Sequence, residues 1–193
     1  MEHQFYAVAV AASGYGIESL IQFLRNIPPD TGASFIITTH IPRNHRSNLD
    51  SLLSKAITMP VIRVESEQVL HPNHLYLLIE NTYLHLKGKT VYPSVRPEDQ
   101  VNRAIDTLFK SLAESFGEKA IGIILDGDGF DGLEGVKAIE KEGGYVMVQQ
   151  PPVSRIPQMT QHAIDGDSPD VIAETPRLAL HLKKHLQGLR MEK

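Results

Sequence analysis

The feature that most constrains the fold of this chain is an alternation of short apolar runs with segments of helical periodicity. The runs contain few polar side chains, which is typical of parallel strands covered on both faces. They are residues Phe5–Ala12, Ser34–Thr39, Leu75–Ile79, Ala120–Leu125 and Tyr145–Val148. Strands that alternate with helices predict an α/β fold with a doubly wound, mainly parallel sheet and helices on both faces.

The helical segments carry apolar side chains at spacings of three and four residues, which indicates one buried face for each helix. They lie within residues 17–24, 49–56, 104–112, 133–139 and 178–186. The stretch Leu75–Leu86 holds two β-rich runs around Glu80-Asn81 and predicts an antiparallel hairpin attached to the sheet. Residues 88–101 and 150–157 are predicted to be irregular.

Size and composition point to a single domain over residues 1–193. The chain is 41% hydrophobic, which is enough to bury one sizeable core. The formal net charge of −4 gives no reason to expect a nucleic-acid partner. The N-terminus lacks a basic signal-peptide region, and no stretch approaches the ~18 apolar residues that a membrane span needs. We therefore expect a cytoplasmic protein without membrane insertion. The chain has no cysteine, which excludes thiolate chemistry.

Polar side chains that can form a hydrolase site follow three of the predicted strands. Ser13 follows the first strand, His40 the second, and Asp131 lies in "DGDGFDG" after the fourth. The carboxyl ends of parallel strands meet at one edge of a sheet, where function gathers. A hydroxyl, an imidazole and a carboxylate are the parts of a Ser-His-Asp site. Taken singly, each residue also has a structural interpretation, as a helix cap or a surface side chain.

Other site types fit the sequence less well. "SGYGIE" lacks the third glycine of the dinucleotide motif and the Gly-Lys of a P-loop, and "DGDGFDGLEGVK" breaks the EF-hand pattern. The order serine, histidine, acid does not match the α/β-hydrolases. One alternative stays open, because "LDGDG" after a strand is typical of magnesium-dependent phosphotransferases, with Asp126 as nucleophile and Asp128 beside it.

Six strings in order resemble the catalytic domain of CheB-type chemotaxis protein-glutamate methylesterases. "AASGYG" places Ser13 on the family's nucleophile, "THIP" places His40 on its base, and "GIILDGDGFDG" places Asp131 on its acid. "NRAIDTLFKSLAESFG" places Arg103 on the family's arginine, and "QMTQHAI" places Met159 on its methionine. "GGYVMVQQ" is similar to the strand that precedes this methionine. The matches cover nearly the whole chain.

The resemblance implies hydrolysis of glutamyl methyl esters on the cytoplasmic helices of methylated chemoreceptors, and deamidation of glutamines there. It implies no cofactor and no metal. Ser13 would attack the ester, with its hydroxyl hydrogen-bonded to Nε2 of His40, and Asp131 would orient the imidazole. Gly14 and the backbone N–H of Asp128 would lie near the oxyanion.

The chain departs from the family pattern around this site. Gly14 and Tyr15 stand where the family has threonine and glycine, Asp128 replaces a methionine, and Thr160 replaces a proline. These changes leave open a degenerate module that binds a receptor or signalling partner without turnover. The family's receiver domain is not expected within residues 1–193, so a receiver or methyltransferase domain would act in trans or in a longer polypeptide.

Overall fold

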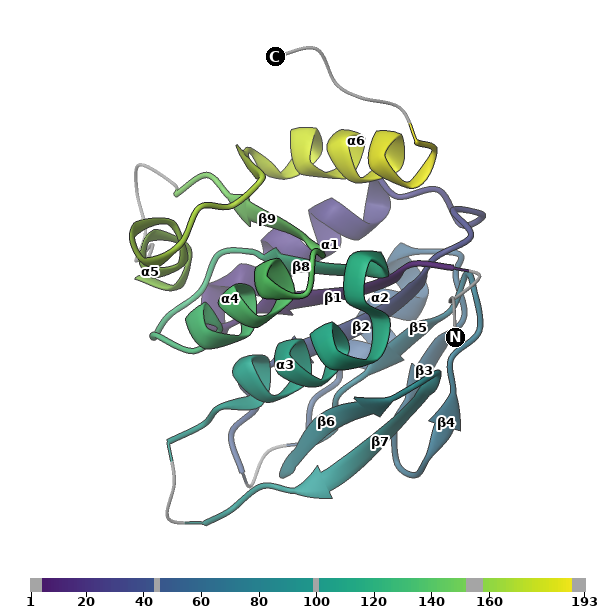
Figure 1. The fold of residues 1–193 in the computed structure, drawn as a ribbon. Coiled ribbons are helices and arrows are strands. Elements are labelled where there is room, and N and C mark those ends of the chain that lie inside the picture. Colours follow the sequence, from purple (N-terminus) through teal and green to yellow (C-terminus); the bar gives the residue numbers. More distant parts are fainter. Residues whose placement is uncertain (1–4, 44–45, 99–100, 152–157, 189–193) are drawn as a thin grey trace.

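The computed structural model describes residues 5–43, 46–98, 101–151 and 158–188. Its largest element is a seven-stranded sheet with the order β10-β9-β8-β1-β2-β5-β3, and its paired strands are parallel (Figure 1). In chain order these strands are β1 (Ala7–Ala12), β2 (Ser34–Thr39), β3 (Val61–Arg63), β5 (Leu75–Leu77), β8 (Ala120–Ile124), β9 (Tyr145–Gln149) and β10 (Val171–Ala173). The chain leaves β1 toward β2 and later returns to β8 on its other side. The predicted doubly wound sheet is confirmed, and its topological switch point lies between β1 and β8.

Helices cover both faces of this sheet, as predicted (Figure 1). One face packs against α1 (Ile17–Arg25), α2 (Leu49–Ala56) and α6 (Thr175–Leu186). The other packs against α3 (Ala104–Phe116), α4 (Leu133–Lys141) and α5 (Gln158–Gly166). Because both faces are buried, β1 and β2 are apolar or small at nearly every position, and all their residues are buried.

A second, antiparallel sheet is attached to the first and has the order β4-β7-β6. Its strands are β4 (Gln68–Val69), β6 (Thr82–Lys87) and β7 (Thr90–Val95). A hairpin is therefore present, but it joins β6 to β7 rather than spanning Leu75–Leu86, and residues 88–101 are not all irregular. The turn is Gly88-Lys89, and Gly88 has a φ of 57°. Glycine with positive φ at the first position of a two-residue loop is the type II′ pattern, which matches the twist of a hairpin. Leu75–Leu77 instead joins the main sheet, parallel to β2.

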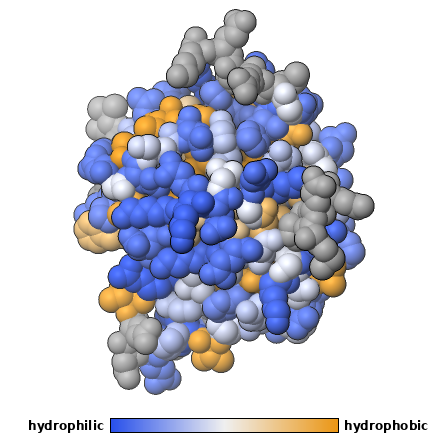
Figure 2. All heavy atoms as spheres, in the orientation of Figure 1, coloured by the Kyte–Doolittle hydropathy of each residue, from blue (hydrophilic) through white to orange (hydrophobic). Residues whose placement is uncertain are grey.

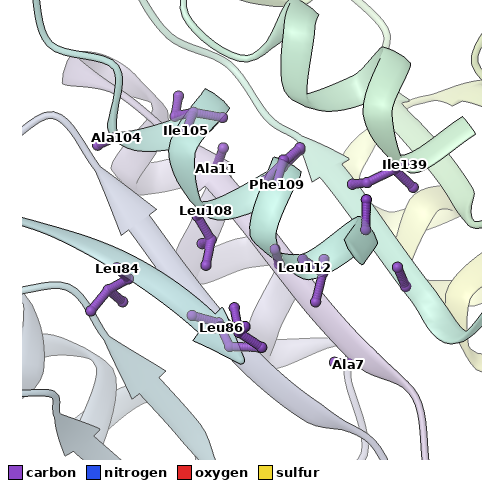
Figure 3. Close-up of a cluster of buried hydrophobic side chains, with 14 of the residues drawn as sticks. Ala7, Ala11, Leu84, Leu86, Ala104, Ile105, Leu108, Phe109, Leu112 and Ile139 are labelled. Carbon is purple, nitrogen blue, oxygen red and sulfur yellow. The ribbon is translucent and has the colours of Figure 1, made fainter. Parts of the chain in front are cut away.

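Helix α3 occupies the centre of the molecule between the two sheets. Ile105, Leu108, Phe109 and Leu112 line its buried face, and they lie over β1 and beside Leu84 and Leu86 of β6 (Figure 3). The burial of these side chains on two sides fixes the helix firmly against β1. The start of α3 is thereby held at the carboxyl edge of the main sheet.

The surface seen in Figure 2 is mostly hydrophilic, and apolar side chains form small separate groups on it. Within the described ranges, no helix combines the length and the apolar character that crossing a membrane requires.

Candidate active site

A sharp turn at the end of β1 presents Ser13. Ser13 is still extended, with φ −142° and ψ 148°, and Gly14 then reverses the chain with a φ of 54°. A 3₁₀ turn at Gly14–Gly16 leads directly into α1. The N–H of Ser13 donates to the carbonyl of Asp126 at 3.3 Å. A Cβ on Gly16 would lie 1.7 Å from that same carbonyl oxygen, so only glycine allows this turn to approach the end of β8.

His40 links Ser13 to Asp131. Nδ1 of His40 lies 3.2 Å from the Oγ of Ser13, and Nε2 lies 2.9 Å from Oδ2 of Asp131. The side chain of His40 is 21% exposed and that of Asp131 only 3%. The structure therefore brings together the three predicted residues in one hydrogen-bonded chain. We expected Nε2 to face the serine, and the structure shows Nδ1 there instead.

Either ring nitrogen can serve the same chemistry, because a neutral imidazole has one N–H donor and one acceptor lone pair. In this orientation, the Nε2–H donates to Asp131, and Nδ1 accepts the hydroxyl proton of Ser13. The carboxylate thereby selects the tautomer whose free lone pair faces the serine.

Asp131 is held by the first turn of α3 as well as by His40. Its Oδ2 accepts a hydrogen bond from the N–H of Ile105 at 2.9 Å, and its Oδ1 accepts one from the N–H of Asp106 at 3.0 Å. These N–H groups have no partner inside the helix, because they lie in its first turn. The positive end of the α3 dipole also favours a carboxylate at this position.

The carboxylate of Asp106, in α3, accepts hydrogen bonds at the start of α4, just as that of Asp131 does at the start of α3. Its Oδ1 accepts hydrogen bonds from the N–H groups of Gly132 and Gly135, at 3.0 and 2.9 Å. Its Oδ2 accepts a hydrogen bond from Nη1 of Arg103 at 3.1 Å. Burial, and then the nearby charge of Asp131, raise the pKa of Asp106 above its ordinary value, and the Gly135 hydrogen bond opposes this shift.

The other predicted site residues lie around this chain at different distances. A Cβ on Gly14 would lie 3.2 Å from Oδ2 of Asp128, so the Asp128 carboxylate lies against the turn that follows Ser13. Met159 is buried, and its N–H donates to the carbonyl of Gly127 at 3.2 Å. Arg103 is largely exposed and pairs with Asp106. The expectation for Tyr15 concerns a side chain outside the described part of the structure.

Two backbone N–H groups beside Ser13 are candidate oxyanion donors. They belong to Gly14 and Asp128, and neither takes part in a hydrogen bond with another described residue. Unpaired N–H groups next to a nucleophile can stabilise the negative charge that develops on a carbonyl oxygen.

Two residues that position the site have no predicted role. Asp106 looks in the sequence like an ordinary acid in the first turn of a helix. Gln149 ends β9, accepts a hydrogen bond from the N–H of Asp126 at 2.9 Å and donates one to the Oγ of Ser19 at 3.3 Å. Gln149 thus ties β9 to the end of β8 and to α1. The string "GGYVMVQQ" includes Gln149 without revealing this contact.

Asp126 and Asp128, the pair considered for magnesium, lie next to the Ser13 turn. Asp126 is buried, and Asp128 is partly exposed. Across the described ranges, no group of three histidine or acidic side chains is arranged so that it could hold a metal ion.

Comparison with known proteins places the chain in a family. The CheB methylesterase family model matches residues 8–182. A protein-glutamate methylesterase/protein-glutamine glutaminase of Thiobacillus denitrificans is 30% identical over 90% of this chain, and the match covers 51% of that relative. A protein of Leptospira interrogans is 28% identical over 91% of this chain and is covered to 92%. The chain thus spans about half the length of the first relative and nearly all of the second.

A solved structure shares the fold of this chain. The CheB methylesterase catalytic domain of Thermotoga maritima superposes with a TM-score of 0.86, covering 95% of this chain and 100% of that domain, at 22% identity. The family model and the relatives confirm the predicted family and enzyme class, a carboxylic ester hydrolase. The chain belongs to the CheB methylesterase family.

Proposed function

We propose that this protein hydrolyses glutamyl methyl esters on the cytoplasmic helices of methylated chemoreceptors, with Ser13 as the nucleophile. The observation that carries the proposal is the hydrogen-bonded chain from Ser13 through His40 to Asp131. It lies at the carboxyl edge of the sheet beside the switch point, where α/β enzymes bind their substrates. The names of the relatives supply the substrate class.

The proposed reaction has two half-reactions, and both use the same three side chains. The Oγ of Ser13 attacks the ester carbonyl while Nδ1 of His40 accepts the hydroxyl proton, and the negative charge of Asp131 stabilises the imidazolium. The N–H groups of Gly14 and Asp128 donate to the oxyanion of the tetrahedral intermediate. Collapse breaks the bond to the methoxy group, which leaves as methanol with the proton from His40. Water, deprotonated by His40, then hydrolyses the acyl-enzyme and releases a glutamate side chain.

Glutamine deamidation follows from the same arrangement, and we include it in the proposal. An amide carbonyl is attacked in the same way, and the nitrogen leaves as ammonia after it takes the proton from His40. The acyl-enzyme is then identical to that formed from the ester. The relatives' names pair the two activities, and neither half-reaction calls for a cofactor.

The domain arrangement also forms part of the proposal. The first and last described strands, β1 and β10, belong to one sheet, which supports residues 1–193 as a single catalytic domain. Relatives about twice as long as this chain support control by a receiver domain, or association with a methyltransferase domain, in trans or in a longer polypeptide. Because the proposed substrate is a cytoplasmic receptor helix, a cytoplasmic location is part of the proposal.

The test is methanol release from a methylated chemoreceptor cytoplasmic fragment. Wild-type protein should release methanol, Ser13→Ala should not, and Ser51→Ala, on the exposed face of α2, should match the wild type. Binding of the fragment without turnover by the intact protein would instead support a degenerate module, an alternative to which the relatives' names give no support. A magnesium-dependent activity that Asp126→Asn abolishes and Ser13→Ala does not would overturn both the esterase hypothesis and the binding-module hypothesis.

A further inference from the structure

Two acidic residues each bind the N-terminus of the neighbouring helix where α3 contacts α4. Asp131, which precedes α4, accepts the N–H groups of Ile105 and Asp106 in the first turn of α3. Asp106, in that same turn, accepts the N–H groups of Gly132 and Gly135 at the start of α4. Each carboxylate therefore satisfies backbone donors of the helix that presents the other. The loop that carries Asp131 cannot shift without breaking hydrogen bonds to Asp106.

The contacts of Asp106 favour its negatively charged form. All three of its partners donate to it: the N–H groups of Gly132 and Gly135, and the guanidinium of Arg103. A protonated carboxyl would instead place an O–H against one of these donors. Its exposed fraction is only 4%, so this charge acts through protein rather than through water.

The charged groups around Asp106 come from two elements. Within the described residues, Asp131 acts on it from the loop before α4, Arg103 acts from the residue just before α3, and Lys110 acts from α3 itself. The strands packed against this end of α3 contribute apolar side chains, such as Ala11 and Leu84 (Figure 3). Arg103 is more than half exposed, so its positive charge is partly screened by solvent, whereas the two carboxylates are both buried.

We propose that Asp106 is a positioning residue for the Ser13–His40–Asp131 chain. It fixes the loop that aims Asp131 at His40, and it places a second buried negative charge behind Asp131 that favours protonated His40. The first effect keeps Nδ1 of His40 within reach of Ser13. The second stabilises the imidazolium that forms when Ser13 attacks. This inference rests on the proposed function, because it assigns His40 the part of the base.

Two variants separate positioning from charge. Asp106→Ala removes the acceptor of Gly132 and Gly135, and a displaced Asp131 should lower kcat by about 100-fold with little change in KM. Asp106→Asn keeps an oxygen that can accept from both glycines, and it removes the charge together with the acceptor for the exposed Arg103. Its kcat should fall by about 10-fold, because proton transfer from Ser13 to His40 becomes less favourable. The acid limb of its pH–rate profile should move to lower pH, because protonated His40 loses the support of a nearby negative charge.

Glu114→Gln is the matched control, since it removes an exposed negative charge from the same helix. It should keep both kcat and the acid limb of the wild type. Circular dichroism and thermal unfolding establish that each variant is folded, and Asp106→Asn keeps the proposal testable if Asp106→Ala does not fold. An acid limb that stays in place in folded Asp106→Asn, or a full kcat in folded Asp106→Ala, would overturn the proposal.

A second measurement needs no substrate. Titration of the Asp106 carboxyl carbon by ¹³C NMR should give a lower pKa in Asp131→Asn than in the wild type, because Asp131 raises the pKa of Asp106. An unchanged pKa would refute the coupling. If the wild type released no methanol while this shift was found, the proposed function would fail and the coupling of the two carboxylates would stand.

Discussion

Nε2 of His40 and Oδ2 of Asp131 lie 2.9 Å apart, and the same oxygen accepts the N–H of Ile105 at 2.9 Å. Asp131, the hydrogen-bond partner of the imidazole, is therefore anchored to a helix that is itself buried against β1. A carboxylate bound to the first turn of a helix has little freedom to rotate away from its partner. The direction of the His40 ring is set by the packing of α3, at some distance from the reacting atoms.

Replacement of Asp131 should remove activity without unfolding the protein. In Asp131→Asn, one oxygen remains to accept from the α3 turn, but the negative charge that stabilises the imidazolium is lost. We expect kcat for methanol release to fall by about 10⁴-fold, the scale seen when a triad acid becomes an amide. The thermal unfolding midpoint should drop by only a few degrees.

The control for this replacement is Asp165→Asn, on the exposed side of α5, which should leave kcat within the error of the assay. A folded Asp131→Asn protein with activity near the wild-type level would show that Asp131 does not act in the triad.

The Asp128 carboxylate lies against the Ser13 turn and should slow the reaction. Negative charge builds up on the substrate oxygen near Asp128, so removing this side-chain charge lowers the repulsion. Because Asp128 is partly exposed, we expect a gain in kcat/KM of only about 3-fold for Asp128→Asn. The gain should shrink in 1 M salt, which screens exposed charges. Asp30→Asn, at the opposite edge of the sheet, serves as the control, and a lower kcat/KM in Asp128→Asn would contradict this account.

Asp106 should make stability depend on pH in a defined direction. Burial and Asp131 raise its pKa in the folded protein above the ordinary value of 3.8. Between those two pKa values, the folded state binds more protons than the unfolded state, so the free energy of unfolding falls as pH rises. Asp106→Asn lacks this titration. The difference in unfolding free energy, wild type minus variant, should therefore fall as pH rises from about 4 through the folded pKa.

Urea denaturation at a series of pH values from acid to neutral measures this difference directly. The comparison with Glu114→Gln removes the general effect of net charge. A difference that stays constant or grows with pH would show that the pKa of Asp106 is not raised in the folded state.

The turn after β1 should not tolerate a side chain at Gly16. A Cβ there would lie 1.7 Å from the backbone carbonyl of Asp126, and backbone cannot move aside as a flexible side chain can. We expect Gly16→Ala to lower the free energy of unfolding by about 3 kcal/mol or more. The control is Gly32→Asn, because Gly32 has open space around it and a φ of 77°, which asparagine accepts more readily than most residues. Equal unfolding midpoints for the two variants would contradict the close approach.

The central elements of the fold could be predicted because their patterns are strong and local. The strands β1, β2, β8 and β9 and five of the helices lie where the apolar runs and stripes place them. The short strands β3, β4 and β10 have only two or three residues each, too few for a periodic signal. Their pairing depends on neighbours that are distant in the sequence.

The hairpin position was predicted wrongly for a physical reason. Pro93 lies within β7, and proline argues against a strand because it lacks the N–H that a ladder needs. β4 pairs with β7 only at Thr90 and Val91. Pro93 therefore lies where β7 has a partner strand on one side, which proline tolerates. Only the tertiary structure shows this, and the sequence instead favoured Glu80-Asn81 as the turn.

The three residues of the candidate site could be predicted to lie together, but the residues that hold them in place could not. Ser13, His40 and Asp131 follow strand ends, a local property that can be read along the chain. The bond from Asp106 to Gly132 joins residues 26 apart, and it depends on how α3 and α4 pack. An acid in the first helical turn is common for reasons of helix stability alone, so Asp106 gives no separate signal.

Because β1 lies between β2 and β8 in the sheet, the residues of the candidate site are synthesised at different times. Ser13 and His40 are 27 residues apart, but His40 and Asp131 are 91 apart. A ribosome that makes the chain from its N-terminus therefore adds Ser13 and His40 long before Asp131. Until the segment after β8 is added, the nascent chain lacks Asp131, the hydrogen-bond partner of Nε2 of His40. The complete hydrogen-bonded chain of Ser13, His40 and Asp131 therefore forms late, when the second half of the sheet joins the first.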